Sequence, residues 1–457
     1  MKQYDQTLAN CQNTRGTVRS MTKRDFLSTA AMGIGGLGLA SLMEPGDLMA
    51  AGGTGKAKRV IHIFLQGAPS HIDTFDPKPA LEALDGKKLD RGVANGSPFK
   101  FNKSGKSGLE ISEIFPNLQQ HADDICVVRS MVTDVPDHNI ATVFMNTGNL
   151  KFVRPSLGAW VTYGLGAENE NLPAFVSLRP GGNPRPQSYQ SAFLPGLNQG
   201  TPINTQLKTV SQMISNIKGY ESLKSQRGML DFLKRQNTLH SLQNNKDSHL
   251  ESRIKSFELA YNMQIEATDA FDISKESKAT LAKYGNTAQG KQLLIARRLA
   301  ERDVRFVQAW HGSWDHHDQL YTAIKGRAKD IDQPLAALIS DLKERGMLDE
   351  TLIIVGGEFG RTARRDGSGR NGYFGRSHSH TGFSTLMIGG GVKGGIAHGA
   401  TDELGINAVT DKMNIHDLHA TVLHTLGFDH KKLTYTYNGR PFRLTDVFGQ
   451  VHKNIIA

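Results

Sequence analysis

The sequence has few of the features that mark disulfide-bonded, nucleic-acid-binding or membrane-spanning proteins. It holds two cysteines in 457 residues, Cys11 and Cys126, which is too few for a disulfide framework. The net charge of +10 is spread along the chain without Lys/Arg blocks or interleaved aromatic residues, so we do not expect nucleic acid as a partner. The positive net charge instead favours an affinity for anionic substrates. A hydrophobic content of 38% and a charged content of 21% indicate a soluble globular protein.

The N-terminal residues have the pattern of an export signal. Residues 22–27 read TKRDFL and precede an uncharged run at 28–43, as in a twin-arginine signal with Lys23 in place of the first arginine. The run is short and rich in glycine, so an uncleaved membrane anchor is the less favoured alternative, and we expect no stable span in the mature form. We therefore expect residues 1–51 to direct export to the periplasm or beyond the cell. Cleavage would remove Cys11, which excludes an intrachain disulfide.

Short apolar runs, rich in branched side chains, indicate the buried strands of an open α/β sheet. They occur at residues 60–65, 125–128, 175–178, 304–309, 351–355 and 383–388, and the last two have the length and branching of parallel strands.

Helical patterns separate most of these runs, and one polar, strongly helical region interrupts the sheet. We therefore expect an α/β domain in two parts, residues 52–205 and 289–457, with a helical insertion or lid at 206–288.

Polar clusters follow several of these strands. In an open α/β sheet, ligands bind at the carboxyl ends of the strands. Carboxylates and imidazoles are common ligands of divalent metals. We therefore expect a metal site at this edge, with ligands drawn from Asp73, Asp315, His317, Glu358 and His378.

Each of these assignments has a plainer alternative. Residues 315–318 would otherwise form a hydrated loop whose histidines cap the next helix. His138 begins a helix whose free N–H groups suit an anion, and it either reaches metal or substrate or caps that helix at the surface. Asp76 is expected to cap a turn before Pro77. His416, His419 and His424 have helical spacing with apolar partners, so we expect them in packing or at the surface.

Ordered motifs along the chain resemble a family of secreted bacterial proteins, abundant in planctomycetes, that is catalogued as domain of unknown function 1501. They include GAPSHIDTFDPKP, DHNIATVFMNTG, RPSLGAWVTYGLG, GEFGRT and GRSH, and the resemblance covers roughly residues 22–445. It implies a place in the alkaline phosphatase-like superfamily, which includes sulfatases. The implied fold is a mainly parallel central sheet flanked by helices. The implied cofactors are one or two divalent ions (Zn, Ca, Mg or Mn) at its carboxyl edge.

Three positions depart from the sulfatase pattern. Asn139 occupies the place of the nucleophilic Cys or Ser, Thr142 that of an arginine, and Gln66 that of a first-strand Asp ligand. Because an amide cannot act as the nucleophile, the expected nucleophile is a water molecule activated by the metal. Ser70 and Thr74 are the alternatives, although nothing in their spacing singles them out. His138 or His71 would serve as general base or as a ligand.

The combined pattern predicts an exported, metal-dependent hydrolase of a sulfate or phosphate ester, either a small molecule or a polysaccharide. The catalytic candidates are His138, His71 and Arg361, where Arg361 and Arg376 orient the anionic group through their guanidinium forks. Surface charge is the alternative for both arginines. A non-catalytic metal- or glycan-binding envelope protein that has lost the nucleophile is the alternative function.

Overall fold

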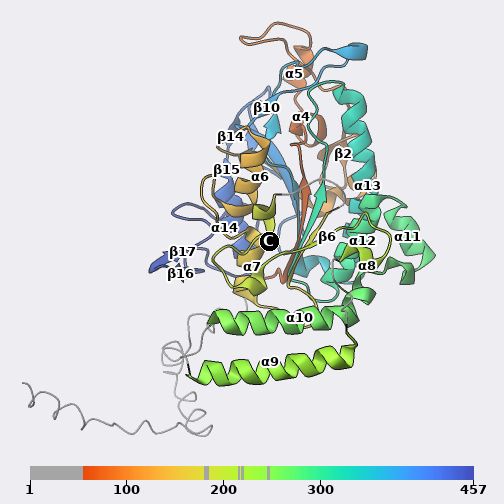
Figure 1. Cartoon of the computed structure of the whole chain (residues 1–457). Helices are drawn as coiled ribbons and strands as arrows, with labels where there is room; N and C mark the ends of the chain where they lie inside the picture. The colour runs from red at the N-terminus through yellow and green to blue at the C-terminus, as the bar shows by residue number, and fades with distance from the viewer. Residues whose placement is uncertain (1–54, 180–184, 215–216, 218–220, 244–247) are drawn as a thin grey trace, which may run out of the picture. The chain divides into compact units, whose positions relative to one another are not determined.

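A nine-stranded sheet forms the centre of the unit that spans residues 52–457 (Figure 1). The strand order along its main path is β12-β4-β11-β8-β1-β7-β5-β6, and β15 also pairs with β4. In that order the strands are Ile396–His398, Ile125–Val132, Phe383–Ile388, Thr351–Gly356, Arg59–Leu65, Phe306–His311, Phe175–Leu178 and Thr201–Ile203, with β15 at Met413–Asn414.

The sheet is mainly parallel, as the sequence predicts, with one exception. Strands β8, β1, β7, β5 and β6 run parallel to one another, and β12 and β15 run parallel to β4. Strand β11 is antiparallel to both of its neighbours, β8 and β4. The prediction of a parallel strand at residues 383–388 is therefore wrong. The chain leaves β8 at one edge of the sheet and re-enters β11 at the same edge, so no crossover connection is needed.

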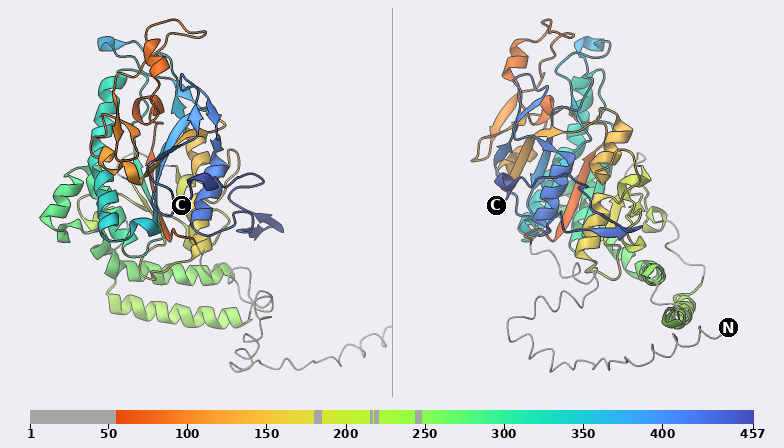
Figure 2. Two further views of the ribbon diagram at one scale, coloured as in Figure 1. Left: turned by 180° about the vertical axis from the view of Figure 1, so that it is seen from behind. Right: turned by 90° about the vertical axis from the view of Figure 1, so that its left-hand side faces the viewer.

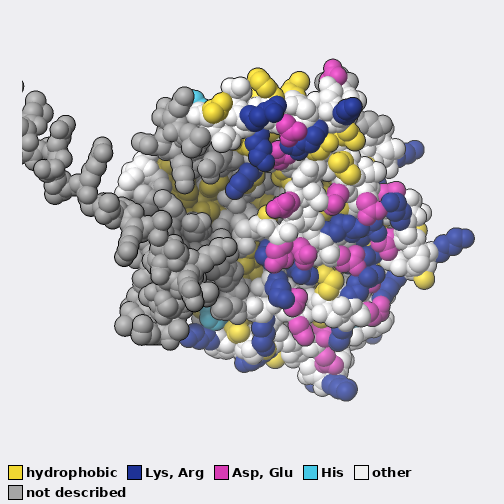
Figure 3. All heavy atoms as spheres, turned by 90° about the horizontal axis from the view of Figure 1, so that it is seen from below, with side chains coloured by type: hydrophobic (Ala, Val, Ile, Leu, Met, Phe, Trp, Pro, Cys, Tyr) yellow, Lys and Arg dark blue, Asp and Glu magenta, His cyan; other side chains and the backbone are white. Residues whose placement is uncertain are grey.

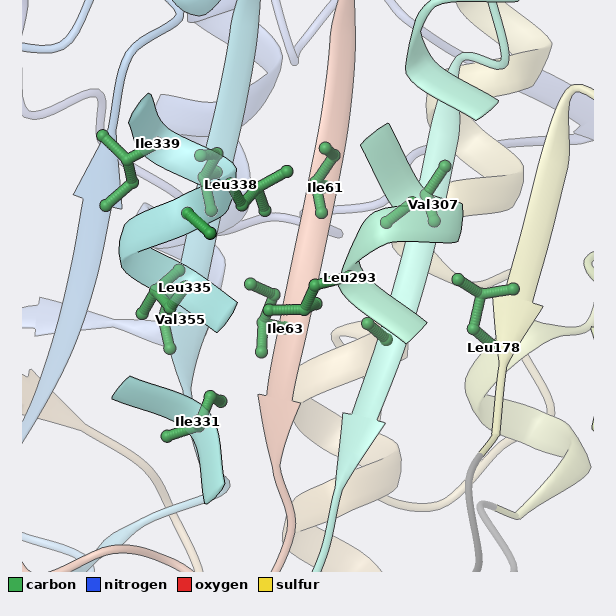
Figure 4. Close-up of a cluster of buried hydrophobic side chains, with 14 of the residues drawn as sticks. Ile61, Ile63, Leu178, Leu293, Val307, Ile331, Leu335, Leu338, Ile339 and Val355 are labelled. Carbon is green, nitrogen blue, oxygen red and sulfur yellow. The ribbon is translucent and has the colours of Figure 1, made fainter. Parts of the chain in front are cut away.

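Helices cover both faces of the sheet. On one face α12 (Ala288–Ala300) and α13 (Leu320–Glu344) pack against the central strands (Figure 4). Ile331, Leu335 and Leu338 of α13 recur at helical spacing and are buried in one core with strand residues such as Ile61 and Val355. Each such burial contributes about 1.5–3 kcal/mol. The other face carries α6 (His138–Thr147), α7 (Leu157–Leu165) and α14 (Ile415–Thr425) (Figure 2).

The predicted insertion at residues 206–288 contains α8 (Val210–Met213), α9 (Leu223–Gln243), α10 (Ser248–Phe271) and α11 (Lys278–Tyr284). In Figure 1 the pair α9 and α10 lies at the end of the domain opposite to β10 (His378–Ser379). These two helices therefore do not lie over the sheet edge at which the predicted ligands stand. Seen from below, acidic and basic side chains are interspersed on the surface (Figure 3), in agreement with the spread charge of the sequence.

The structure is a computed structural model that describes residues 55–179, 185–214, 217, 221–243 and 248–457. The predicted export signal at residues 1–51 lies outside these residues. Within the described ranges, none of the helices is long and apolar enough to cross a membrane. Cys126 is a free, buried residue of β4, and burial raises the pKa of its thiol to about 12.

Candidate metal centre

Five segments bring polar side chains to one edge of the sheet. Strands β1, β4, β7 and β8 all end at this edge, and β11 begins there because it runs antiparallel. The ends of these strands are followed or preceded by the main polar residues of the site: Gln66 and Gly67 after β1, His138 after β4, Asp315 and His317 after β7, Glu358 after β8, and His378 before β11. Four of the five predicted ligands, together with His138, are therefore brought together.

The centre of the group is formed by Asp315 and three imidazoles. Single donor atoms of His138, Asp315 and His378 all lie within 4.8 Å of one another. The Asp315 carboxylate is 3.3 Å from His138 Nε2, 2.9 Å from His317 Nε2 and 3.4 Å from His378 Nε2. His378 Nε2 lies 3.0 Å from the Nε2 atoms of both His138 and His317. Four side chains from three loops thus converge on one small volume.

Each imidazole is oriented by an acceptor at its other ring nitrogen. The Nδ1 partners are the Glu358 carboxylate for His138 (2.6 Å), the Asp366 carboxylate for His317 (2.7 Å) and the Pro136 carbonyl for His378 (2.9 Å). A neutral imidazole that donates from Nδ1 presents a lone pair at Nε2. With all three rings neutral, three lone pairs would face one another, and a cation bound between them would relieve that repulsion. Carboxylates and carbonyls behind the ligand histidines are the usual outer shell of a metal site.

Glu358 is fully buried and serves as one of these orienting groups. Its Oε1 faces His138 and also accepts a hydrogen bond from the Gly67 N–H (2.9 Å). Its Oε2 is buried and has no hydrogen-bond partner among the described residues. An unpaired buried carboxylate oxygen is costly, so this atom also fits a cation. Imidazole nitrogen with carboxylate oxygen is a donor set that suits a divalent transition metal.

The pKa shifts of His138, Asp315 and His378 follow from their burial and from the charges beside them. Burial lowers the pKa of His138, but hydrogen bonds and charges from Asp315 and Glu358 outweigh it and raise the pKa to about 9. Burial raises the pKa of Asp315, yet hydrogen bonds from His138 and Arg361 hold it well below its usual range. Burial lowers the pKa of His378. In the metal-free protein a proton on His138 thus supplies the positive charge between two carboxylates.

Asp73, predicted as a ligand, is not part of this group. It is fully buried in α4 (His71–Thr74) and forms a bidentate ion pair with Arg376, with Nε–Oδ2 at 2.7 Å and Nη2–Oδ1 at 3.0 Å. Its Oδ2 also accepts from Ser70 Oγ. Both oxygens are therefore used within the protein. The same ion pair corrects the role predicted for Arg376, because a guanidinium buried against Asp73 cannot orient a substrate.

Arg361 is also buried and acts as a support. Its guanidinium donates to the carbonyls of Ala68, Gly67 and Arg376 and to Asp315 Oδ1, the last at 2.6 Å. A guanidinium has five N–H donors, and that of Arg361 makes four interactions within the protein. Arg361 is therefore better placed to position Asp315 than to bind an anion.

His71, the other catalytic candidate, is buried and shares no hydrogen bond with this group among the described residues. Its Nε2 lies 2.8 Å from the Gly405 carbonyl, and its Nδ1 has no partner among the described residues. Burial lowers its pKa.

A cavity of about 500 Å³ adjoins the group and shares His138 as one wall. Several of its lining residues are not among the predicted site residues. The rest of its lining includes Gln66, Asn139, Thr142, Arg179, Arg185 and Tyr189. Arg179 directly follows β5, so the strand-end rule that found Asp315 would also have found it. Asp366 lies inside the polar 357–382 loop and carries no comparable local signal.

The comparisons with known proteins identify the family. The family model described as "Protein of unknown function (DUF1501)" matches residues 57–456. The chain belongs to this family. No curated protein matches it.

Among solved structures, this DUF1501 protein is similar to three enzymes at low identity. The lipoteichoic acid synthase LtaP from Listeria monocytogenes has 11% identity and a TM-score of 0.39, with 86% of this chain and 76% of that chain covered. The PsFucS1 sulfatase from Pseudoalteromonas sp. has 12% identity and a TM-score of 0.34, with 92% and 78% covered. The phosphonate monoester hydrolase SpPMH from Silicibacter pomeroyi has 13% identity and a TM-score of 0.35, with 81% and 73% covered. At these TM-scores the likeness carries no conclusion about function.

Proposed function

We propose that this DUF1501 protein is an exported, metal-dependent hydrolase of a phosphate or sulfate ester. The observation that carries the proposal is the convergence of three imidazole Nε2 atoms on the Asp315 carboxylate, each imidazole oriented from behind by an acceptor. Three imidazoles that direct their Nε2 atoms at one carboxylate and at one another are arranged for a shared cation.

The residues have distinct roles in this proposal. His138, Asp315 and His378 would hold the metal, with His317 beside them, while Glu358 and Asp366 orient the imidazoles. A bound divalent ion supplies Lewis acidity toward an ester oxyanion and lowers the pKa of water. The three imidazoles favour zinc over calcium or magnesium, which prefer oxygen donors.

The chain offers no side-chain nucleophile where the resemblance places one. Asn139 is exposed at the second residue of α6, and its amide cannot attack phosphorus or sulfur. Hydrolysis in this proposal therefore uses water, and the protein contributes binding and orientation. The cavity next to His138 admits the ester, and Arg361 keeps Asp315 in place through Oδ1.

The test combines metal analysis with turnover. Purified mature protein is assayed for bound metal and for hydrolysis of 4-nitrophenyl phosphate and 4-nitrophenyl sulfate with added Zn²⁺, Mn²⁺, Mg²⁺ or Ca²⁺. We expect Asp315→Asn and His378→Ala to lose metal and to lower turnover by at least about 100-fold, since a metal supplies several kcal/mol of transition-state stabilisation. Arg91→Gln, an exposed arginine outside the site, is the matched control. Metal-loaded protein without turnover on either ester would refute the hydrolase.

The second candidate, a non-catalytic metal- or glycan-binding envelope protein, is favoured by one observation. Asn139 stands at the expected nucleophile position beside an otherwise assembled site. Bound metal without turnover is the result that this candidate predicts. Protein that binds no metal, with a melting temperature unchanged by chelator, would exclude a metal role in either function.

A further inference from the structure

The cavity beside His138 has a lining unlike that of the metal centre. It lies between the end of β1, the start of α6, the end of β5 and the short helix η2 (Pro186–Tyr189). Its volume of about 500 Å³ is within the range of about 300–1,000 Å³ that is usual for small-molecule sites. None of its described lining residues is acidic, whereas two, Arg179 and Arg185, are arginines. The metal centre is rich in carboxylates, so the two neighbouring sites have opposite charge.

Two polar groups in this lining are buried without partners. Thr142 is 3% exposed, and its Oγ1 makes no hydrogen bond within the described chain, although helical threonines often bond to the preceding turn. The Nε of Arg179 is likewise buried and unpaired in that part of the chain. The Arg179 Nε–H is a donor, and the Thr142 hydroxyl is able to donate. Buried polar groups without partners are rare in folded proteins. A ligand atom that accepts hydrogen bonds would satisfy both the Thr142 hydroxyl and the Arg179 Nε–H.

The geometry points to this cavity as the subsite for an oxyanion group on a small hydroxyl-rich molecule, namely a phosphorylated or sulfated sugar. Arg179 and Thr142 bind the anionic oxygens, and Arg185, which is exposed, adds charge at the cavity. The side-chain amides of Gln66 and Asn139 and the phenol of Tyr189 can both donate to and accept from sugar hydroxyls. The identity of the ligand as a substrate rests on the proposed function, but its binding does not.

This assignment explains the departure at Thr142. The resemblance to sulfatases places an arginine at that position of the helix, and a threonine there leaves the anion without a guanidinium. Arg179 lines the same cavity from the end of β5 and supplies one from another strand. Arg361 and Arg376 cannot do so, because both are buried and bound within the protein.

The test measures ligand binding directly by calorimetry at fixed ionic strength. The probes are glucose 6-phosphate, glucose 6-sulfate and uncharged glucose, and the proteins are the wild type, Arg179→Gln, Arg179→Lys, Thr142→Val and Thr142→Ser. Arg91→Gln serves as the control for loss of one positive charge. All variants are checked for an unchanged melting temperature, and Arg179→Lys keeps the charge if Arg179→Gln fails to fold.

We expect the wild type to bind the two charged sugars and not glucose. Arg179→Gln should weaken binding about tenfold to a hundredfold, as for loss of a charge-assisted hydrogen bond, and Thr142→Val about tenfold. Thr142→Ser should restore most of the affinity because it keeps the hydroxyl. Equal affinities for Arg179→Gln and Arg91→Gln would overturn the subsite, as would the absence of binding of both charged sugars to the wild type.

The two proposals fail separately. Protein that hydrolyses no ester, yet loses sugar phosphate binding in Arg179→Gln, keeps the subsite and loses the hydrolase. Protein that hydrolyses an ester, yet binds glucose 6-phosphate equally well in the wild type and in Arg179→Gln, keeps the hydrolase and loses the subsite.

Discussion

Replacing Asp73 by asparagine distinguishes a structural carboxylate from a metal ligand. The sequence places Asp73 among the ligands, whereas the structure places it in a buried ion pair with Arg376, both side chains at 0% exposure. The asparagine removes the negative charge and keeps the shape. Arg376 would retain its hydrogen bonds to the carbonyls of Asn95 and Thr362, but its charge would be buried without a counter-ion.

The expected magnitude follows from this burial. Removing one partner of a buried ion pair costs about 3–5 kcal/mol of folding free energy. Unfolding entropy is about 2.1 cal/mol/K per residue. Over the roughly 400 residues of the folded unit this gives about 0.8 kcal/mol/K, so the loss lowers the melting temperature by about 4–6 °C. Metal content should be unchanged.

The assay is thermal unfolding together with metal analysis of the same samples, with Asp315→Asn as the matched variant. Asp315 is partly exposed although its partner Arg361 is buried, so its substitution should remove metal and, in chelator, lower the melting temperature less than Asp73→Asn does. The reasoning is refuted if Asp73→Asn loses metal at an unchanged melting temperature in chelator. A further check is the double variant Asp73→Leu/Arg376→Met, which should be more stable than Asp73→Asn because it removes both charges.

Two further predictions test the site and the core. Glu358→Gln should weaken metal affinity about 10–100-fold, measured by chelator competition, because the amide orients the His138 imidazole less firmly than the carboxylate does. Stability should fall on acidification below about pH 6.5, because burial lowers the pKa of His62 to about 4 and of His419 to about 3. In that window the unfolded chain binds protons that the folded chain excludes, so each histidine contributes a slope of about 1.4 kcal/mol per pH unit. Denaturant unfolding between pH 7 and 4 measures how the free energy of unfolding changes with pH. This change should be smaller in His419→Gln than in the wild type.

The local part of the site could be predicted from the sequence. Asp315, Glu358 and His138 each follow a buried strand, and the carboxyl ends of parallel strands meet at one edge. The alternation of apolar runs and helical patterns likewise predicted the mainly parallel sheet. In each case the apolar run and the polar residue that follows it are close together in the sequence, so one sequence is enough to recognise them.

Long-range pairing could not be predicted in the same way. Asp73 satisfies the strand-end rule as well as Asp315 does, but its partner Arg376 is 303 positions away in the sequence. The direction of β11 was missed for a similar reason. Whether two consecutive strands are parallel depends on where the intervening loop travels, and neither run contains that information. Asp366 likewise has no strand-end signal, and only the folded chain places its carboxylate against His317.

The 357–382 loop shows how the fold turns a long connection into a defined site. Strands β9 (Gly360–Arg361) and β10 pair His378 opposite Arg361, so the two ends of the loop meet beside Glu358. Among the residues that the structure describes, Arg361 is the one guanidinium bound to a group that also includes the carboxylates of Asp315, Glu358 and Asp366. With neutral histidines this leaves an excess of two negative charges, which a divalent cation would neutralise and the His138 proton only halves. The neighbouring cavity is cationic through Arg179 and Arg185. In the proposed hydrolysis of a charged ester, a cation bound at this group and the arginines of the cavity would flank the same oxyanion from two sides.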